Sequence, residues 1–349
     1  MNKYEPLGRK LDLRRGRVDL SHGAGGRAMA RLIADVFHAA FDNDFLRAGN
    51  DQSAFDVAAG RMVMTTDGYV VSPLFFPGGD IGDLAVNGTI NDIAMAGARP
   101  LYMSASFILE EGFPLADLQR IAVSMGAASR AARVPIITGD TKVVERGKAD
   151  GVFISTACVG VAPVGLDLSG DKARPGDVVL LSGPIGDHGV AVMSRRENLA
   201  FETEVLSDNA ALHEPVAVMI DAGGASIRLM RDPTRGGLAA TLNEIAHQSR
   251  VGVRIRETAI PIRPQVAAAC ELLGLDPLFV ANEGKLVAFV APDAAETVLA
   301  AMRAHPLGRE SARIGEVIDD DQCFVQMTTG FGGGRIVDWL SGEQLPRIC

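Results

Sequence analysis

The sequence predicts an α/β protein of two domains, and three observations lead to this prediction. The chain has 349 residues, which is long enough for two domains with separate apolar cores. Hydrophobic residues make up 47% of the chain and charged residues 22%, as in globular proteins. Segments with strand and helix periodicity alternate along most of the chain. One very large domain fits these features less well than two successive α/β domains.

The first α/β domain is expected to span residues 46–163, and residues 1–45 form an N-terminal segment with a glycine-rich turn and a helix. Alternating apolar residues predict strands, and an apolar period near 3.6 residues predicts helices. The expected strands are 61–71, 101–110, 135–144 and 151–161, and the expected helices are 81–97 and 115–134.

The second domain is expected at residues 177–329, after a linker. The linker prediction rests on the stretch GLDLSGDKARPGD, which combines glycine, proline and charge without periodicity. The final residues, 330–349, begin with glycines and have the composition of a flexible tail that ends in Cys349. The expected strands of the second domain are 178–183, 227–232, 251–257, 284–291 and 312–318, and the expected helices are 184–196, 213–224, 235–249, 264–273 and 294–305.

Composition also excludes several classes of protein. The net charge of -9 argues against a nucleic-acid-binding protein, because phosphate backbones attract clustered Lys and Arg. No apolar run is long enough to span a bilayer, and the basic N-terminus lacks the apolar segment of a signal peptide. The four cysteines lack metal-ligand spacing and are too few for a disulfide framework. We therefore expect a cytoplasmic protein that contacts neither nucleic acid nor membrane, in which Cys158 is an inert, buried strand residue.

Aspartates gather at the ends of predicted elements in the first domain. Carboxylate oxygens are the ligands that magnesium prefers, and magnesium usually keeps phosphate oxygens as partners. For any single aspartate, a helix cap or a turn residue is a better explanation than a metal ligand, and Asp80 in particular is placed to cap the helix that follows it. The aspartates of this set are Asp51, Asp67, Asp80, Asp83, Asp92 and Asp140.

The stretch SHGAGGRAM places Gly25 and Gly26 before a predicted helix. Backbone N–H groups at such a helix start can bind an anion. The chain contains neither GxxxxGK[ST] nor a GxGxxG after a strand. A nucleotide, if bound, must therefore be held by an architecture other than a P-loop or a dinucleotide-binding fold.

Further candidate residues lie in three short stretches and at the end of the chain. In GDTKVVE, Lys142 follows Asp140 and Thr141 at a strand end, where an ammonium can meet a phosphate or a reacting group. In RDPTRGGLA, Asp232 and Thr234 lie at a strand-to-helix turn, where a carboxylate and helix N–H groups converge. Glu283 in ANEGKL precedes a strand, and a surface position is the default for a glutamate. A terminal thiol such as Cys349 is reactive unless it is protected.

Taken together, these stretches resemble the HypE family of hydrogenase maturation factors, within the AIR synthase-like (PurM-like) superfamily. The matching stretches run from LSHGAGGRAM through TTDGYVVSPLFFPGGDIGDLAVNGTINDIAMAGA, ITGDTKVVERG, RDPTRGGLA and ANEGKL to the terminal PRIC. AIR synthase, selenophosphate synthetase and thiamine monophosphate kinase are similar in overall plan, but they do not end in Pro-Arg-Ile-Cys. Residues before Ser21 match no motif of the family.

The resemblance implies an activity. In HypE-like proteins the terminal cysteine, here Cys349, receives a carboxamide from the carbamoyltransferase HypF, and the protein dehydrates it to a thiocyanate with ATP. The cyanide then goes to the iron of a nickel-iron hydrogenase through the HypC–HypD scaffold complex. Phosphorylation of the carboxamide oxygen makes it a good leaving group, and a base must remove the protons from nitrogen.

The resemblance also implies roles for individual residues. Lys142 and Glu283 match the positions that the family offers for the base, although Lys142 is equally suited to clamp the transferred phosphoryl group. A homodimer is implied as well, with ATP near its interface. The implied magnesium ligands are Asp51, Asp67, Asp92, Asp140 and Asp232, and the implied nucleotide-binding residues are Gly25, Gly26, Asp67, Thr89, Asn91, Asp140, Thr141, Asp232 and Thr234.

Two other interpretations fit the same sequence. One is another PurM-like ATP-dependent enzyme that acts on a small molecule and in which Cys349 is incidental. The other is a binding scaffold without enzymatic activity, whose terminal cysteine is an attachment point. Prenylation is excluded, because three residues must follow the modified cysteine.

Overall fold

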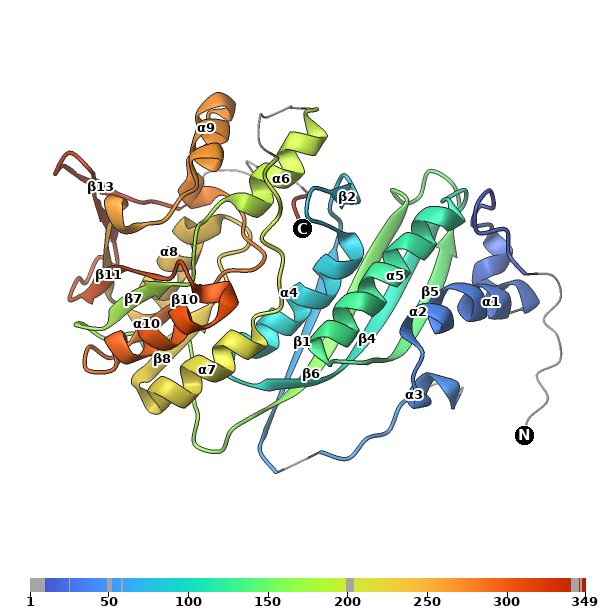
Figure 1. Cartoon of the computed structure of the whole chain (residues 1–349), viewed down its shortest axis with the longest axis horizontal. Coiled ribbons are helices and arrows are strands. Elements are labelled where there is room, and N and C mark those ends of the chain that lie inside the picture. The colour runs from blue at the N-terminus through green and yellow to red at the C-terminus, as the bar shows by residue number, and fades with distance from the viewer. Residues whose placement is uncertain are drawn as a thin grey trace.

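The computed structural model describes residues 10–24, 26–48, 52–57, 59–198, 204–339, 345 and 347–349. Gly25 and Asp51, two residues of the predicted site, lie outside the described residues. Figure 1 shows two lobes joined side by side, with the C-terminus between them. The described part of the chain contains no helix that is long and apolar enough to cross a membrane.

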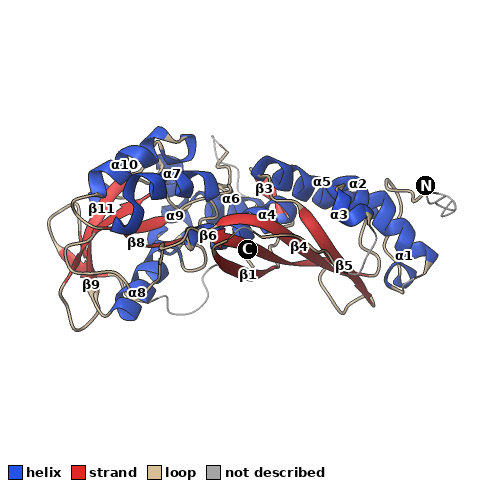
Figure 2. Cartoon of the chain, turned by 90° about the horizontal axis from the view of Figure 1, so that it is seen from below, coloured by secondary structure: helices blue, strands red, loops and turns tan. Residues whose placement is uncertain are grey.

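The first domain is a four-stranded sheet with helices on one face. The strands stand in the order β1-β6-β4-β5, and all neighbours are antiparallel except the parallel pair β4 and β5. The helices α4 and α5 pack against one face, whereas no described element of the chain covers the opposite face (Figure 2). The bounds are β1 Arg61–Tyr69, α4 Ile81–Met95, β4 Arg99–Glu110, α5 Leu115–Ala132, β5 Ile136–Val144 and β6 Val152–Ala162, with the short pair β2 Phe75–Phe76 and β3 Gly79–Asp80 before α4.

Helix α4 is the central element of this domain and is buried on almost every side. It begins where the side chain of Asp80 accepts hydrogen bonds from the N–H groups of Gly82 and Asp83, and Asp83 bonds back to the N–H of Asp80. This reciprocal capping fixes the start of the helix. The prediction that Asp80 is a cap is thereby confirmed.

The N-terminal segment lies against the β5 edge of the sheet. Its Phe37 ring packs 4.6 Å from the ring of Phe107 on β4, centroid to centroid. The segment contains a 3₁₀ helix, Leu20–Gly23, followed by α1 Arg27–Leu32, a π-helical stretch Ile33–His38, α2 Ala39–Phe41 and α3 Asp44–Arg47.

The second domain is a seven-stranded sheet between two layers of helices. The strand order is β13-β12-β9-β11-β7-β10-β8, with α8 against one face and α7 with α10 against the other. The strands are β7 Val178–Leu181, β8 Ile227–Arg231, β9 Gly252–Arg256, β10 Val287–Val290, β11 Ala312–Ile318, β12 Val325–Thr328 and β13 Gly334–Ile336. The helices are α6 Asp187–Arg196, α7 His213–Gly223, α8 Gly237–Ser249, α9 Pro264–Leu273 and α10 Ala295–Ala304.

The predicted α/β fold with two domains is confirmed, and each expected strand and helix of residues 61–318 is present. Four strands were missed. The pair β2 and β3 and the strand β12 are short, and β13 lies inside residues 330–349, which the sequence predicts to be a flexible tail. Glycine-rich composition predicted flexibility there, but the hydrogen bonds from β13 to β12 depend on a sheet edge that the local sequence does not reveal.

Candidate active site between the two domains

The C-terminus is inserted between the two domains, where it pairs with the segment that follows β1. The N–H of Val70 donates to the Cys349 carbonyl over 3.2 Å, and the N–H of Ser72 donates to the Arg347 carbonyl over 3.1 Å. The Arg347 guanidinium donates back to the Val70 carbonyl at 2.9 Å. Through these contacts, residues 347–349 lie alongside residues 70–72 in the manner of a short added strand.

The second domain holds the same three residues from the other side. His188 Nε2 lies 2.8 Å from the Ile348 carbonyl, and the Arg196 guanidinium donates to the carbonyls of both Ser72 and Arg347. The Ile348 side chain is only 4% exposed and joins the core of the first domain. The tail therefore rests inward, with Cys349 beside the groups at the domain boundary.

Glu283 is a buried carboxyl group, and its charge has the largest electrostatic effect on the terminal thiol. It is 3% exposed, and its Oε1 has no hydrogen-bond partner among the described residues. Burial, followed by the charge of Asp232, raises the pKa of Glu283 well above its ordinary value. Burial and the Glu283 charge in turn raise the pKa of the Cys349 thiol to about 12. The expectation of a surface glutamate at this position is wrong.

Three aspartates from three different elements act on one another, and two of them, Asp67 and Asp232, also act on this pair. Asp67 lies on β1, Asp92 on α4, and Asp232 directly after β8. Burial and the charges of Asp92 and Asp67 raise the pKa of Asp232 to about 7, and burial followed by Asp67 raises the pKa of Asp92. These mutual shifts mean that the carboxylates share one region of negative potential.

A buried hydrogen-bond network fixes Asp67. The Tyr69 hydroxyl donates to Asp67 Oδ2 at 2.9 Å and lies 3.2 Å from the Thr89 hydroxyl. Thr89 in turn contacts Thr156 on β6 and donates to the carbonyl of Ala85. Thr89 is fully buried, so in this structure it supports the site from behind.

Asn91 connects the two domains through its side-chain amide. Its Nδ2 donates to the carbonyls of Ala210 and Glu283 at 3.0 and 3.1 Å, and its Oδ1 accepts from the N–H of Leu212. The residue is 1% exposed. Its amide holds the backbone that carries Glu283, which is a supporting position rather than the exposed one that contact with a nucleotide requires.

The other predicted catalytic residue, Lys142, lies far from this cluster within one chain. It is exposed on β5, where its Nζ lies 3.0 Å from Asp140 Oδ2. Because β6 and β4 separate β1 from β5, the edge with Asp67 and the edge with Asp140 are about 14 Å apart. One chain therefore does not bring Lys142 to Glu283, nor Asp140 to the other aspartates.

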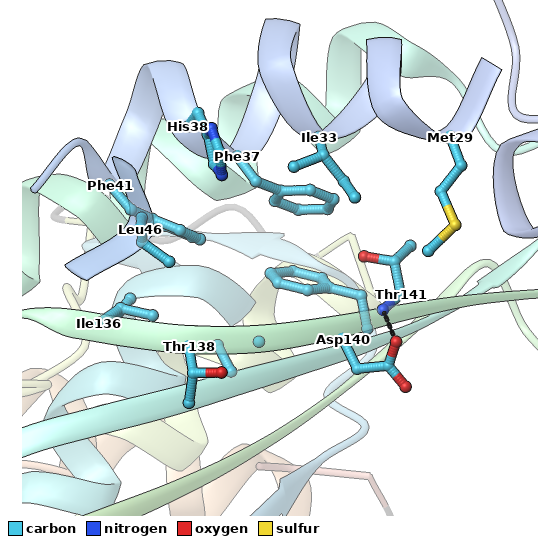
Figure 3. A pocket seen from close by; sticks show the side chains of 13 residues that line it. Met29, Ile33, Phe37, His38, Phe41, Leu46, Ile136, Thr138, Asp140 and Thr141 are labelled. Atoms are coloured by element: carbon cyan, nitrogen blue, oxygen red, sulfur yellow. Dashed lines mark hydrogen bonds between the residues drawn. The ribbon is translucent and has the colours of Figure 1, made fainter. Parts of the chain in front are cut away.

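An apolar pocket opens beside Asp140 and Thr141, between β5 and the N-terminal segment. Figure 3 shows the Phe37, Phe41 and Ile33 side chains above the sheet, with Thr141 and Asp140 at one end. Thr141 is buried, and its N–H donates to Asp140 Oδ1 at 2.8 Å. A pocket with apolar walls and a polar end is typical of a site for a flat organic ring.

The turn that carries Asp232 and Thr234 explains the glycines of the RDPTRGGLA stretch. Gly236 and Gly237 have φ angles of +74° and +61°, and a Cβ on Gly237 would come within 2.5 Å of the Leu278 carbonyl. The turn leads into α8 and directs Asp232 toward the carboxylate cluster. At the N-terminus of α1, Gly26 is the residue that caps the helix start.

No group of three His, Cys, Asp or Glu side chains in the described ranges is arranged to hold a metal ion by itself. Asp67, Asp92 and Asp232 are coupled electrostatically, but they need additional oxygen ligands to complete a magnesium site. Phosphate oxygens are the natural source of such ligands.

Sequence reasoning missed His188, Tyr69 and Arg196. The stretch GDHGVAV resembles an ordinary helix start, and Tyr69 resembles an ordinary strand residue. Their roles depend on contacts between domains. For Tyr69 a signal existed: Gly88 lies within α4, and a Cβ there would come within 2.4 Å of the Tyr69 hydroxyl.

Comparison with known proteins places this geometry in a family. The AIR synthase related protein family matches twice, with its N-terminal domain over residues 49–162 and its C-terminal domain over residues 174–328. Carbamoyl dehydratase HypE of Rhizobium leguminosarum bv. viciae is 78% identical over 98% of this chain and 97% of its own length. HypE of Escherichia coli (strain K12) is 45% identical over 95% of this chain and 99% of its own. The chain belongs to the HypE family of carbamoyl dehydratases.

Solved structures of HypE proteins agree. A hydrogenase maturation protein HypE in complex with ATP superimposes with a TM-score of 0.91 at 49% identity, covering 95% of this chain and 99% of the other. A HypE–HypF complex contains a chain with a TM-score of 0.78 at 48% identity, covering 88% and 99%. The expected carbamoyl dehydratase of hydrogenase maturation is thereby confirmed, and the interpretation as a scaffold without enzymatic activity is not supported.

Proposed function

We propose that this chain dehydrates an S-carboxamide on its own Cys349 to a thiocyanate with ATP. The observation that carries the proposal is the insertion of Cys349 beside the buried Glu283. ATP transfers its terminal phosphoryl group to the carboxamide oxygen, and the nitrogen loses one proton. Loss of the second proton then expels phosphate and forms the C≡N bond. The products are the thiocyanate, ADP, phosphate and one proton.

Glu283 is proposed to accept a proton from the carboxamide nitrogen. Its free Oε1 points to no other described partner, and its backbone is held in place by Asn91 and by the N–H bond from Glu283 to Asp208 Oδ1. A carboxylate with a raised pKa is a stronger base once it is ionised. These buried contacts fix the position of the Glu283 backbone.

The nucleotide is proposed to bind between two copies of this chain. Its base fits the apolar pocket lined by Phe37 and Phe41, and its phosphates then pass Thr141, Asp140 and Lys142. From the β5 edge of one chain they reach the β1 edge of the partner, where Asp67, Asp92 and Asp232 supply magnesium ligands together with phosphate oxygens. Gly26 and Thr234 are the remaining described candidates for phosphate contacts.

A homodimer is supported by the uncovered face of the first sheet. Met62, Met64 and Ile108 project from this face, and Met64 is 72% exposed. Large apolar side chains that are exposed on one uncovered face favour association. Pairing of two such faces by a twofold axis that runs parallel to the strands would place the β5 edge of one copy near the β1 edge of the other.

Mixing two inactive variants tests this arrangement. Lys142→Ala chains keep Cys349, and Cys349→Ala chains keep Lys142. If Lys142 acts on the tail of the partner, mixed dimers regain activity at one of their two sites, and an equal mixture reaches about a quarter of the wild-type rate. If Lys142 acts within its own chain, the mixture stays inactive.

HypF is proposed as the carbamoyl donor, since a related chain forms a HypE–HypF complex. The HypC–HypD complex is proposed as the acceptor of the cyanide. A cytoplasmic location is proposed because the cysteines of the chain are free thiols.

The central experiment is mass spectrometry of the chain after incubation with HypF and its carbamoyl donors, before and after addition of Mg-ATP. We expect a carbamoyl mass on the Cys349 peptide, followed by loss of the mass of one water only with ATP. If Cys349 stays unmodified while ATP is consumed with a small molecule, the PurM-like small-molecule enzyme with an incidental cysteine is the better interpretation.

A further inference from the structure

We propose that His188 is a positioning residue that holds the C-terminal tail in its inward place and so sets the balance between dehydration and tail release. The proposal rests on the proposed function, because it assigns a role in the movement of Cys349. The observation behind it is a hydrogen bond between domains, from a side chain of α6 to the backbone next to the reacting cysteine.

The hydrogen bonds of the imidazole define its tautomer. The Ile348 carbonyl lies 2.8 Å from Nε2 and only accepts, so Nε2 carries the proton. On the other side of the ring, Nδ1 lies 2.8 Å from Ser207 Oγ. That oxygen already accepts from the N–H of Asn209 at 3.1 Å, which leaves its own proton for Nδ1. Burial lowers the pKa of His188 and favours the same neutral form.

The ring is fixed by packing as well as by hydrogen bonds. His188 has 0% exposure, and its ring meets the Phe76 ring edge to face at 5.4 Å between centroids. Phe76 belongs to β2 of the first domain, whereas His188 belongs to the second. The donor therefore cannot follow the tail if the tail moves.

The Ile348 carbonyl depends on this donor. Ile348 is buried, and a buried carbonyl without a partner is unfavourable by more than a hydrogen bond contributes in water. Ile348 directly precedes Cys349, so the bond fixes the peptide unit that sets the direction of the thiol. Loss of the donor favours the released tail, in which the carbonyl is hydrated.

The test compares His188→Leu, which removes both nitrogens but keeps volume, with His188→Gln, whose amide N–H can reach the same carbonyl. His213→Leu is the matched control, because it removes a histidine that does not touch the tail. The first readout is iodoacetamide alkylation of Cys349 in the full chain, followed by peptide mass spectrometry. Cys158, Cys270 and Cys323 are buried and report general unfolding.

We expect alkylation of Cys349 to be about fivefold faster in His188→Leu. This is the change in the equilibrium between inward and released tail that the loss of one hydrogen bond produces. His188→Gln is expected within twofold of wild type, and His213→Leu is expected to be unchanged. In single-turnover assays His188→Leu is expected to dehydrate the carboxamide more slowly than wild type, by less than the fivefold change in alkylation because the inward fraction falls less than the small released fraction rises, and without loss in carbamoylation by HypF. Equal slowing of both steps, or no change in alkylation, overturns the proposal.

Two further features keep the outcome interpretable. If His188→Leu exposes the three buried thiols, Ser207→Ala replaces it, because it keeps the ring packing but removes the proton that fixes the tautomer. An increase of about twofold in alkylation is then expected, and no increase overturns the proposal. Alkylation needs neither HypF nor ATP, so its result stands even if Cys349 proves not to be the substrate.

Discussion

The two edges of the first sheet hold acidic residues in opposite electrostatic states. At the β1 edge, burial and neighbouring carboxylates raise the pKa values of Asp92, Asp232 and Glu283. At the β5 edge, the hydrogen bond from Lys142 lowers the pKa of Asp140, and both side chains are exposed. In the arrangement proposed above, this difference makes the two edges two half-sites: one edge presents protonatable carboxyl groups and the thiol of Cys349, and the other presents a paired charge to solvent.

The largest expected effect is that of Glu283→Gln, which removes the proton acceptor at the β1 edge but keeps its shape. We expect the dehydration rate to fall about a hundredfold or more, while carbamoylation of Cys349 continues. Single-turnover mass spectrometry measures both steps on the same peptide. If the variant keeps a third of the wild-type dehydration rate, Glu283 is not the proton acceptor.

At the β5 edge, Lys142→Ala is expected to lower the dehydration rate about a hundredfold, since a charged group aimed at a transferred phosphoryl group contributes that much. The ion pair with Asp140 favours the role of a charged clamp, so Lys142→Arg is expected to keep the rate within about tenfold. Lys148→Ala, in the exposed turn after β5, is the control. If Lys142→Arg is as inactive as Lys142→Ala, Lys142 is the base instead.

The edges should also differ in what they contribute to stability. Asn91→Ala leaves three backbone groups near Glu283 without partners and is expected to lower the free energy of unfolding by about 2–4 kcal/mol. Asp140→Asn breaks only an exposed pair and is expected to change it by less than about 1 kcal/mol. Urea denaturation of both variants measures the contrast. Similar losses would mean that the β5 edge is as rigid as the β1 edge.

The smallest effect is a pH dependence. The pKa of Asp232 is about 7 in the folded chain, above its ordinary value of 3.8. The folded state therefore binds more protons between these values, and the free energy of unfolding falls as pH rises from about 4 to about 7. Asp232→Asn is expected to reduce that fall by about 1–2 kcal/mol, measured as the difference from wild type at pH 5 and pH 7.5. If the free energy of unfolding depends on pH equally in both proteins, the pKa of Asp232 is not raised in the folded chain.

The sequence predicted the elements of both domains because their periodicity is local. It also identified Glu283, Asp67, Asp92 and Asp232, which the fold brings to one region, although the burial of Glu283 could not be predicted from a stretch such as ANEGKL. The separation of Lys142 from Glu283 follows from strand order, which arises from long-range pairing rather than from local pattern. The inward tail depends on His188 and Arg196, two residues with no distinctive local motif.

The tail contacts described above have a further consequence for how the chain carries its cargo. Val70, Ser72, His188 and Arg196 bind main-chain atoms of residues 347–349, and the Arg347 side chain adds one bond to Val70, so none of these hydrogen bonds involves the Cys349 side chain. Binding of the tail through its backbone does not depend on the sulfur substituent. The free thiol, the carboxamide and the thiocyanate forms of Cys349 can therefore occupy the same site. The tail then carries the sulfur substituent while its backbone is bound in the same way at every stage. Only the few groups around the sulfur distinguish one stage of the cycle from the next.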